Sequence, residues 1–128
     1  MPGNPTITLV VVNSASSPGA GYTETTASNG GTYWYLYTGG DNNGGNVTFT
    51  SRGPVTIVVQ LQSASNFSIN TVGFTGDVNN QLSTSGNSAT NITIHNKNNA
   101  VQTAEYKVTV SDSTAGCTVP CDPTIINR

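Results

Sequence analysis

The chain has 128 residues, with only four basic and six acidic side chains and a formal net charge of −2. Charged residues make up 8% of the sequence, against about 25% in typical domains, which excludes a charge-rich disordered chain. So few basic residues form no basic patch, and we expect neither nucleic acid nor a membrane as a partner. The length predicts a single domain over residues 1–128 with a core of its own.

The N-terminal end carries no targeting signal that we recognise. Residues 1–5 lack a basic segment, and the apolar run from Ile7 to Val12 is too short for a signal peptide or a membrane span. The sequence as written therefore predicts a cytoplasmic protein. A secreted protein whose signal had been removed would look the same.

The apolar residues recur with the period of two that β-strands show, and no window has helical periodicity. In chain order, the predicted strands cover residues 6–13, 31–38, 46–51, 55–63, 67–75, 89–95 and 104–112. The intervening segments 13–31 and 77–87 are rich in Gly, Ser, Thr and Asn and predict loops. Seven or eight strands separated by turn signals predict an all-β fold, an antiparallel β-sandwich of the immunoglobulin-like kind.

One predicted strand alternates between aromatic and apolar positions on its two faces. Tyr33, Tyr35 and Tyr37 share one face, which we call the tyrosine face, and Trp34 and Leu36 share the other. We expect Trp34 and Leu36 to face the core. The tyrosine face would then be exposed and could contact a second copy of the chain or a sugar.

The expected core consists of the apolar positions that alternate inward along the strands. These are Trp34, Leu36, Ile57, Val59, Ile92, Ile94, Val108 and Val110. Gly73 predicts a bulge in its strand. Two adjacent β-branched residues, Ile125 and Ile126, favour a sheet over a free end and predict that the C-terminal tail is anchored.

The C-terminal segment, residues 113–128, contains the only Asp-Pro bond of the chain, Asp122–Pro123. The Asp side-chain carboxyl can reach its own backbone carbonyl and close a five-membered ring. The leaving group is then a proline nitrogen, which belongs to an easily protonated tertiary amide. The alternative interpretation is turn chemistry, since Asp caps its own backbone and Pro presets φ.

The same segment holds both cysteines, Cys117 and Cys121. They could bridge across a turn, or remain free thiols in a reducing cytoplasm. A metal site would need four ligands, and one histidine, His95, with no second cysteine pair does not supply them. We expect no metal and no cofactor.

The sequence DPTIINR over residues 122–128, preceded by a strand pattern rich in Thr and Val, resembles the end of the DP-EP family. These are small bacterial β-sandwich proteins named for Asp-Pro endopeptidase and described as self-cleaving and self-assembling. The resemblance implies that the chain cuts its own Asp122–Pro123 bond and that the tail from Pro123 stays bound in the sandwich. It also implies that a lysine captures the Asp122 carboxyl as an isopeptide.

The predicted strands over 89–95 and 104–112 are joined by a modest loop and predict a hairpin. The polar face of this hairpin would bring His95 close to Glu105 and Lys107, because residues on one face of paired strands lie about 5 Å apart. Glu105 and Lys107 also point the same way, since they are two positions apart on one strand.

A tail that adds beside this face would bring Asp122 to these groups. The backbone carbonyl of Asp122 would be the electrophile. Its side-chain carboxylate would be the intramolecular nucleophile, attacking that carbonyl directly or through a water that it orients. Glu105 or His95 would donate a proton to the Pro123 nitrogen.

Lys107, if burial keeps it neutral, could attack the activated Asp122 carboxyl and form the isopeptide. Lys97, in an Asn-rich turn, is the second candidate. The alternative for Glu105 and Lys107 is an exposed ion pair of little energetic weight.

Two functions follow from these observations. The first is an autoproteolytic Asp-Pro endopeptidase that acts once, in cis, and associates with copies of itself. The second is a non-enzymatic binding or assembly module that uses the tyrosine face, with the Asp-Pro sequence as a simple turn. Both are compatible with a β-sandwich, because that fold hosts many functions.

Overall fold

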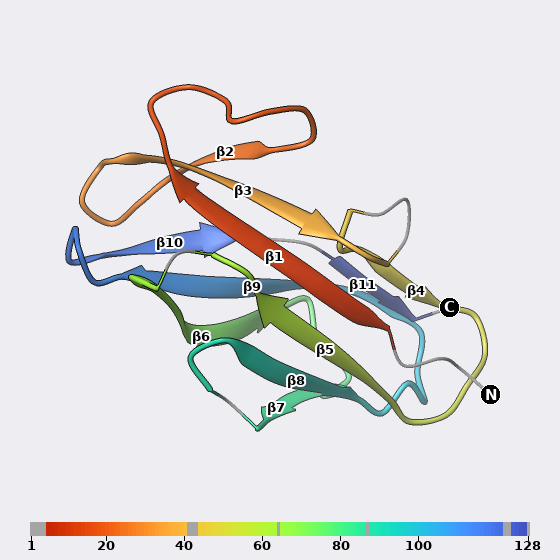
Figure 1. Ribbon diagram of the computed structural model, residues 1–128. Helices are drawn as coiled ribbons and strands as arrows, with labels where there is room; N and C mark the ends of the chain where they lie inside the picture. The colour runs from red at the N-terminus through yellow and green to blue at the C-terminus, as the bar shows by residue number, and fades with distance from the viewer. Residues whose placement is uncertain (1–4, 41–43, 64, 87, 122–123, 128) are drawn as a thin grey trace.

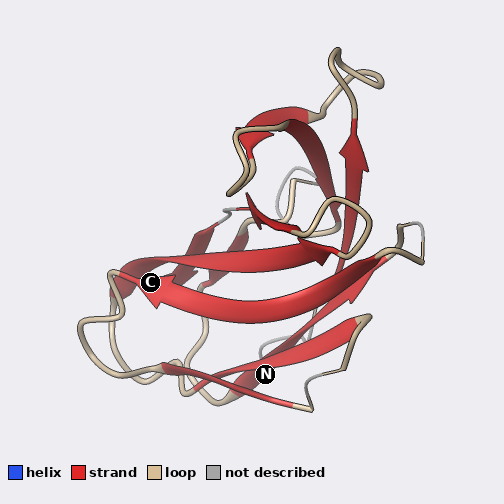
Figure 2. Cartoon of the chain, turned by 90° about the vertical axis from the view of Figure 1, so that its left-hand side faces the viewer, coloured by secondary structure: helices blue, strands red, loops and turns tan. Residues whose placement is uncertain are grey.

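A computed structural model describes residues 5–40, 44–63, 65–86, 88–121 and 124–127. Within these ranges the chain forms eleven strands and no helix, so the predicted all-β class is confirmed (Figures 1 and 2). The same ranges contain no helix long and apolar enough to cross a membrane.

The strands form two mixed sheets (Figure 1). The first sheet contains β1 (Thr6–Asn13), β2 (Thr23–Thr26), β3 (Thr32–Thr38), β5 (Val55–Leu61), β7 (Leu82–Ser85) and β8 (Asn91–Asn96) in the order β2-β3-β1-β5-β8-β7. The second sheet contains β4 (Val47–Phe49), β6 (Phe67–Thr75), β9 (Gln102–Asp112), β10 (Cys117–Cys121) and β11 (Thr124–Asn127). β9 pairs with β6 on one edge and with β10 and β11 on the other, and β4 pairs with β11.

The predicted number of strands was too low, and the predicted antiparallel pairing is wrong in two places. β2 and β7 lie within segments predicted as loops, because short strands rich in Thr and Ser show no apolar alternation. β1 pairs with β5 in parallel, and β11 pairs with β4 in parallel. The predicted hairpin is also wrong, since β8 belongs to the first sheet and β9 to the second.

Both sheets contribute to one buried cluster. It includes Ile7, Leu9, Val11, Ile57, Val59, Ile92 and Ile94 from the first sheet and Tyr106, Val108, Val110, Val119 and Ile125 from the second. The inward positions predicted for β5, β8 and β9 are therefore confirmed. The pairing register of β6 on β9 shifts between Ile69 and Thr71. The bulge was predicted at Gly73, so the observed irregularity lies before the predicted position.

The predicted orientation of β3 is wrong. Tyr33 and Tyr37 are 1% and 4% exposed and belong to the core, whereas Trp34 and Leu36 are half-buried. Both faces of β3 are apolar, so the alternation alone could not select the inner one. The tyrosines can face inward because each hydroxyl has a hydrogen-bond acceptor on the opposite sheet.

Candidate site at the junction of β10 and β11

β10 and β11 pair with β9 in one continuous register. Cys121, the last residue of β10, lies opposite Val108, and Thr124, the first residue of β11, lies opposite Glu105. Thr124 is three positions after Cys121, and its partner Glu105 is three positions before Val108 on β9. The two strands form a single line beside β9 with one two-residue interruption (Figure 1).

The interruption is the Asp122–Pro123 sequence, and both residues lie outside the described part of the chain. The β9 residues between the two flanking pairs are Tyr106 and Lys107. Tyr106 is buried and faces the core, and Lys107 is exposed on the outer face. Burial of Lys107, on which its expected neutral state depended, is therefore contradicted.

Glu105 and Lys107 share the outer face of β9, as their spacing predicted. They line a pocket of about 280 Å³ together with Gly73, Phe74 and Thr75 of β6. Gly73 lies opposite Lys107, and a Cβ at that position would meet no atom within 4 Å. Because glycine has no side chain, the space beside Lys107 is left open on this side.

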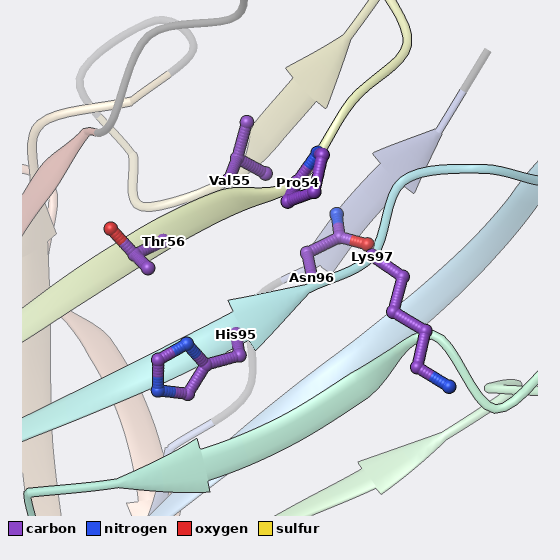
Figure 3. A pocket seen from close by; sticks show the side chains of 6 residues that line it. All are labelled: Pro54, Val55, Thr56, His95, Asn96 and Lys97. Carbon is purple, nitrogen blue, oxygen red and sulfur yellow. The ribbon is translucent and has the colours of Figure 1, made fainter.

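His95 is not part of this group. It is exposed on β8, in the first sheet, opposite Thr56 of β5. Its Nε2 atom forms a hydrogen bond with the Ser85 hydroxyl of β7. Together with Lys97, it lines a separate pocket of about 240 Å³ (Figure 3). The structure thus brings together Glu105 and Lys107 among the predicted side chains. It leaves His95 on β8 of the other sheet and Lys97 directly after that strand.

A pair of buried tyrosines lies on the inner side of the junction. The Tyr37 hydroxyl donates a hydrogen bond of 2.9 Å to the carbonyl oxygen of Cys121. The Tyr106 hydroxyl donates one of 2.7 Å to the carbonyl oxygen of Gly45. The two rings pack edge to face with centroids 6.0 Å apart. Burial raises the pKa of the Tyr106 hydroxyl, which favours the protonated form that donates this hydrogen bond.

β11 is fixed by contacts of its own. It pairs with β9 on one side and with β4 on the other, and the Ile125 side chain is fully buried. The buried amides of Asn127 and Asn96 form two reciprocal hydrogen bonds, of 2.8 and 3.1 Å. Because Asn96 belongs to β8, this pair joins the C-terminal strand to the opposite sheet. The predicted anchoring of the tail is confirmed.

At the other end of the line, β10 begins beside a buried carboxylate. The Asp112 side chain accepts hydrogen bonds from the Tyr33 hydroxyl (2.6 Å) and from the Asn66 amide (2.8 Å). Burial by itself would raise the pKa of Asp112, but these hydrogen bonds and two from the backbone hold it below its ordinary value. Burial and the contact with Asp112 raise the pKa of Tyr33.

The two cysteines lie on the inward face of β10 and are buried. They are four positions apart on an extended strand, which separates their Cα atoms by about 13 Å. A disulfide needs a separation below about 7 Å, so of the two alternatives the bridge across a turn is excluded and the two free thiols are confirmed. The Cys117 sulfur instead lies 3.2 Å from the Tyr33 hydroxyl.

Sequence reasoning assigned no role at the junction to four residues that surround it, namely Tyr37, Tyr106, Asn96 and Asn127. Each acts through a partner at least 31 positions away in the chain, or on another strand, so no local pattern could identify it. No known family model matches the chain. A search of curated proteins finds no significant match either.

Proposed function

We propose that this chain is a self-processing β-sandwich protein, with the two facing sheets of an immunoglobulin-like domain, that breaks its own Asp122–Pro123 bond once. The observation that carries the proposal is the single register of β10 and β11 on β9. Because β11 has ladders on both edges, the peptide beyond the bond would remain in the sheet after the bond is broken.

The proposed reaction begins within Asp122. Its side-chain oxygen bonds to its own backbone carbonyl carbon, and the bond from that carbon to the Pro123 nitrogen breaks. The nitrogen takes up a proton, and a cyclic anhydride remains. An intramolecular attack of this kind avoids the entropy cost of a bimolecular step, which can amount to about 7–11 kcal/mol.

We propose that Glu105 donates the proton to the Pro123 nitrogen and that Lys107 captures the anhydride. Glu105 lies opposite Thr124, the residue that follows Pro123, which favours Glu105 as the proton donor. A water that opens the anhydride restores two carboxyl groups. Alternatively, the Lys107 amine attacks the side-chain carbon of the anhydride, loses a proton and forms an isopeptide, while the backbone carboxylate leaves.

Lys107 is favoured over Lys97 by its position on β9. On β9 it lies between Val108, the partner of Cys121, and Glu105, the partner of Thr124. His95 belongs to β8 of the other sheet, Lys97 follows directly after β8, and neither has a role in this proposal.

Denaturing mass spectrometry over several days tests the proposal. We expect the wild type to lose the hexapeptide Pro123–Arg128 while native gel filtration still shows it bound. Asp122→Ala should abolish cleavage, and Asp122→Asn should slow or abolish it, because neither retains the carboxylate. An isopeptide would make the larger fragment lighter by one water, and Lys107→Ala should remove this difference, whereas Lys97→Ala should not.

A wild type that stays intact, or an Asp122→Ala variant that is cut equally well, would reject the endopeptidase. A non-enzymatic binding or assembly module would then be the remaining function. The tyrosine face could not be its contact surface as predicted, because Tyr33 and Tyr37 are buried. Association with copies of itself would have to use another surface.

A further inference from the structure

We infer that a binding site for a doubly charged oxyanion such as phosphate lies at the end of β8 and is formed by Arg52, His95 and Lys97. The sequence has four Lys and Arg residues and one histidine, and the site gathers three of these five side chains. All three are exposed. His95 lies in the first sheet, whereas β10 and β11 belong to the second, and the inference does not depend on the proposed cleavage.

His95 and Lys97 line one pocket, which has a volume of about 240 Å³ (Figure 3). Exposed and buried residues alternate at positions 95–98, so His95 and Lys97 face outward while Asn96 and Asn98 face inward. The described residues that line this pocket include no carboxylate. A bound anion would therefore meet positive charge without a competing acidic side chain in the lining.

Arg52 is brought to the same place by Asn98, the residue directly after Lys97. The side-chain oxygen of Asn98 accepts a hydrogen bond from the Arg52 guanidinium (3.4 Å), and its amide donates to the carbonyl oxygen of Ser51 (2.6 Å). The backbone carbonyl of Asn98 also accepts from the Gly53 amide (3.2 Å). Three consecutive residues of the loop before β5 are thus bonded to Asn98, which places the guanidinium beside the segment that carries Lys97.

Asn98 is suited to this role by its conformation and its burial. It is 0% exposed and has a φ of +51°, a left-handed conformation that asparagine adopts more readily than most residues. Its backbone amide donates to the side-chain oxygen of Asn96 (3.0 Å), and the Lys97 amide donates to the Gln81 carbonyl (2.9 Å). The backbone that carries the cations is therefore fixed without a ligand, which lowers the ordering cost of binding.

The three side chains supply the charge and the donors that an oxyanion needs. A lysine ammonium has three N–H donors and an arginine guanidinium has five, and each carries a positive charge. Arg52 and Lys97 alone therefore match the two charges of the anion. His95 adds a further donor, and its ring is oriented by the hydrogen bond with the Ser85 hydroxyl. A singly charged carboxylate would use fewer of these groups.

Titration of the full chain with inorganic phosphate, followed by NMR, tests the inference. His95 is the only histidine, so the imidazole signals report on this site alone. At constant pH and ionic strength, we expect phosphate to shift these signals along a saturating curve. Sulfate, which shares the charge and the tetrahedral shape, should do the same. Acetate should bind at least about tenfold more weakly, because it carries one charge.

Variants locate the site. Lys97→Ala and Arg52→Ala should each weaken phosphate binding about tenfold, because each removes a hydrogen bond to a charged group. Both side chains are exposed and outside the core, so both variants should fold. Lys107→Ala is the matched control, since it removes the same exposed charge from β9 in the other sheet. It should leave the affinity within about twofold of the wild type, because salt screens separated surface charges.

Three results would overturn the inference. A shift of the His95 signals that rises linearly with phosphate, without saturation, would show that no site exists. Equal weakening in Lys97→Ala, Arg52→Ala and Lys107→Ala, or no weakening in any of them, would show that these side chains do not form a local site. Acetate binding as tight as phosphate binding would show that the site does not select a doubly charged oxyanion.

Discussion

β10 and β11 follow one another along β9 in the same register, but different contacts hold them. β10 pairs with β9 along one edge, and on its other side it meets the loop and edge strand around β2. There the Thr25 hydroxyl donates to the Pro120 carbonyl (3.1 Å), and the Ser28 hydroxyl accepts from the Thr118 amide (2.9 Å). β11 instead has a strand on each side and a buried amide pair to the opposite sheet.

The difference concerns the contacts that would hold each strand if the proposed cleavage separated them. β10 is continuous with β9 through a short turn at residues 113–116, so it stays in place through the chain itself. β11 is only four residues long, yet it has two ladders, a fully buried isoleucine and a buried asparagine. If the proposed cleavage occurs, these are the contacts that would have to hold the peptide beyond the broken bond.

The largest expected effect comes from Ile125. Ile125→Ala should destabilise the protein by about 2–5 kcal/mol in urea unfolding, because the side chain is fully buried in the core and leaves a cavity. Ile126→Ala is the matched control, since the same residue type on the same strand is half-buried, and we expect about 1 kcal/mol. In cleaved protein, Ile125→Ala should release the hexapeptide on gel filtration. Equal losses in the two variants would show that β11 is not anchored by its inner face.

The start of β10 depends on a charge instead. Asp112→Asn should cost about 1.5–3 kcal/mol at neutral pH, because a buried carboxylate loses its charge-assisted hydrogen bonds from Tyr33 and Asn66. The pKa of Asp112 is lowered from 3.8 by folding, so its contribution is present above pH 3.8 and is lost as the pH falls through the folded pKa.

Urea unfolding at a series of pH values measures this contribution. The stabilities of the wild type and of Asp112→Asn should converge as the pH falls below 3.8. Glu105→Gln is the control, since this carboxyl is exposed on the same strand. A constant difference between the wild type and Asp112→Asn down to pH 2 would show that the charge of Asp112 does not matter.

The comparison also explains which features the sequence could predict. Where only one face of a strand is apolar, as in β8 and β9, alternation identified the inner residues, and Ile92, Ile94, Val108 and Val110 are buried. Where both faces are apolar, as in β3, alternation left two choices. The inner face is set by hydroxyl acceptors at Asp112 and Cys121, which lie 79 and 84 positions from their donors.

The candidate site was predictable in part for the same reason. Glu105 and Lys107 share a face because local strand geometry requires it. His95 was assigned to their neighbourhood because consecutive strands often form hairpins, but β8 and β9 belong to different sheets. Sheet membership depends on all the strands together, and no segment of the sequence encodes it alone.

The smallest expected effect, and the sharpest test of how β11 is held, concerns the amide pair of Asn96 and Asn127. Asn127→Ala should cost about 1–3 kcal/mol, because the Asn96 amide stays buried and loses its partner. Asn96→Ala should cost more within that range, because its side-chain oxygen also accepts from the backbone amide of Asn98 (3.0 Å). The double variant should cost less than the sum of the two single variants, since each single change already breaks the shared hydrogen bonds.

The control is Asn99→Ala, which changes an exposed asparagine in the loop after β8 and should leave stability within about 0.5 kcal/mol of the wild type. Urea unfolding of the four variants measures these differences, and additive costs for Asn96 and Asn127 would show that the two amides do not stabilise β11 as a pair.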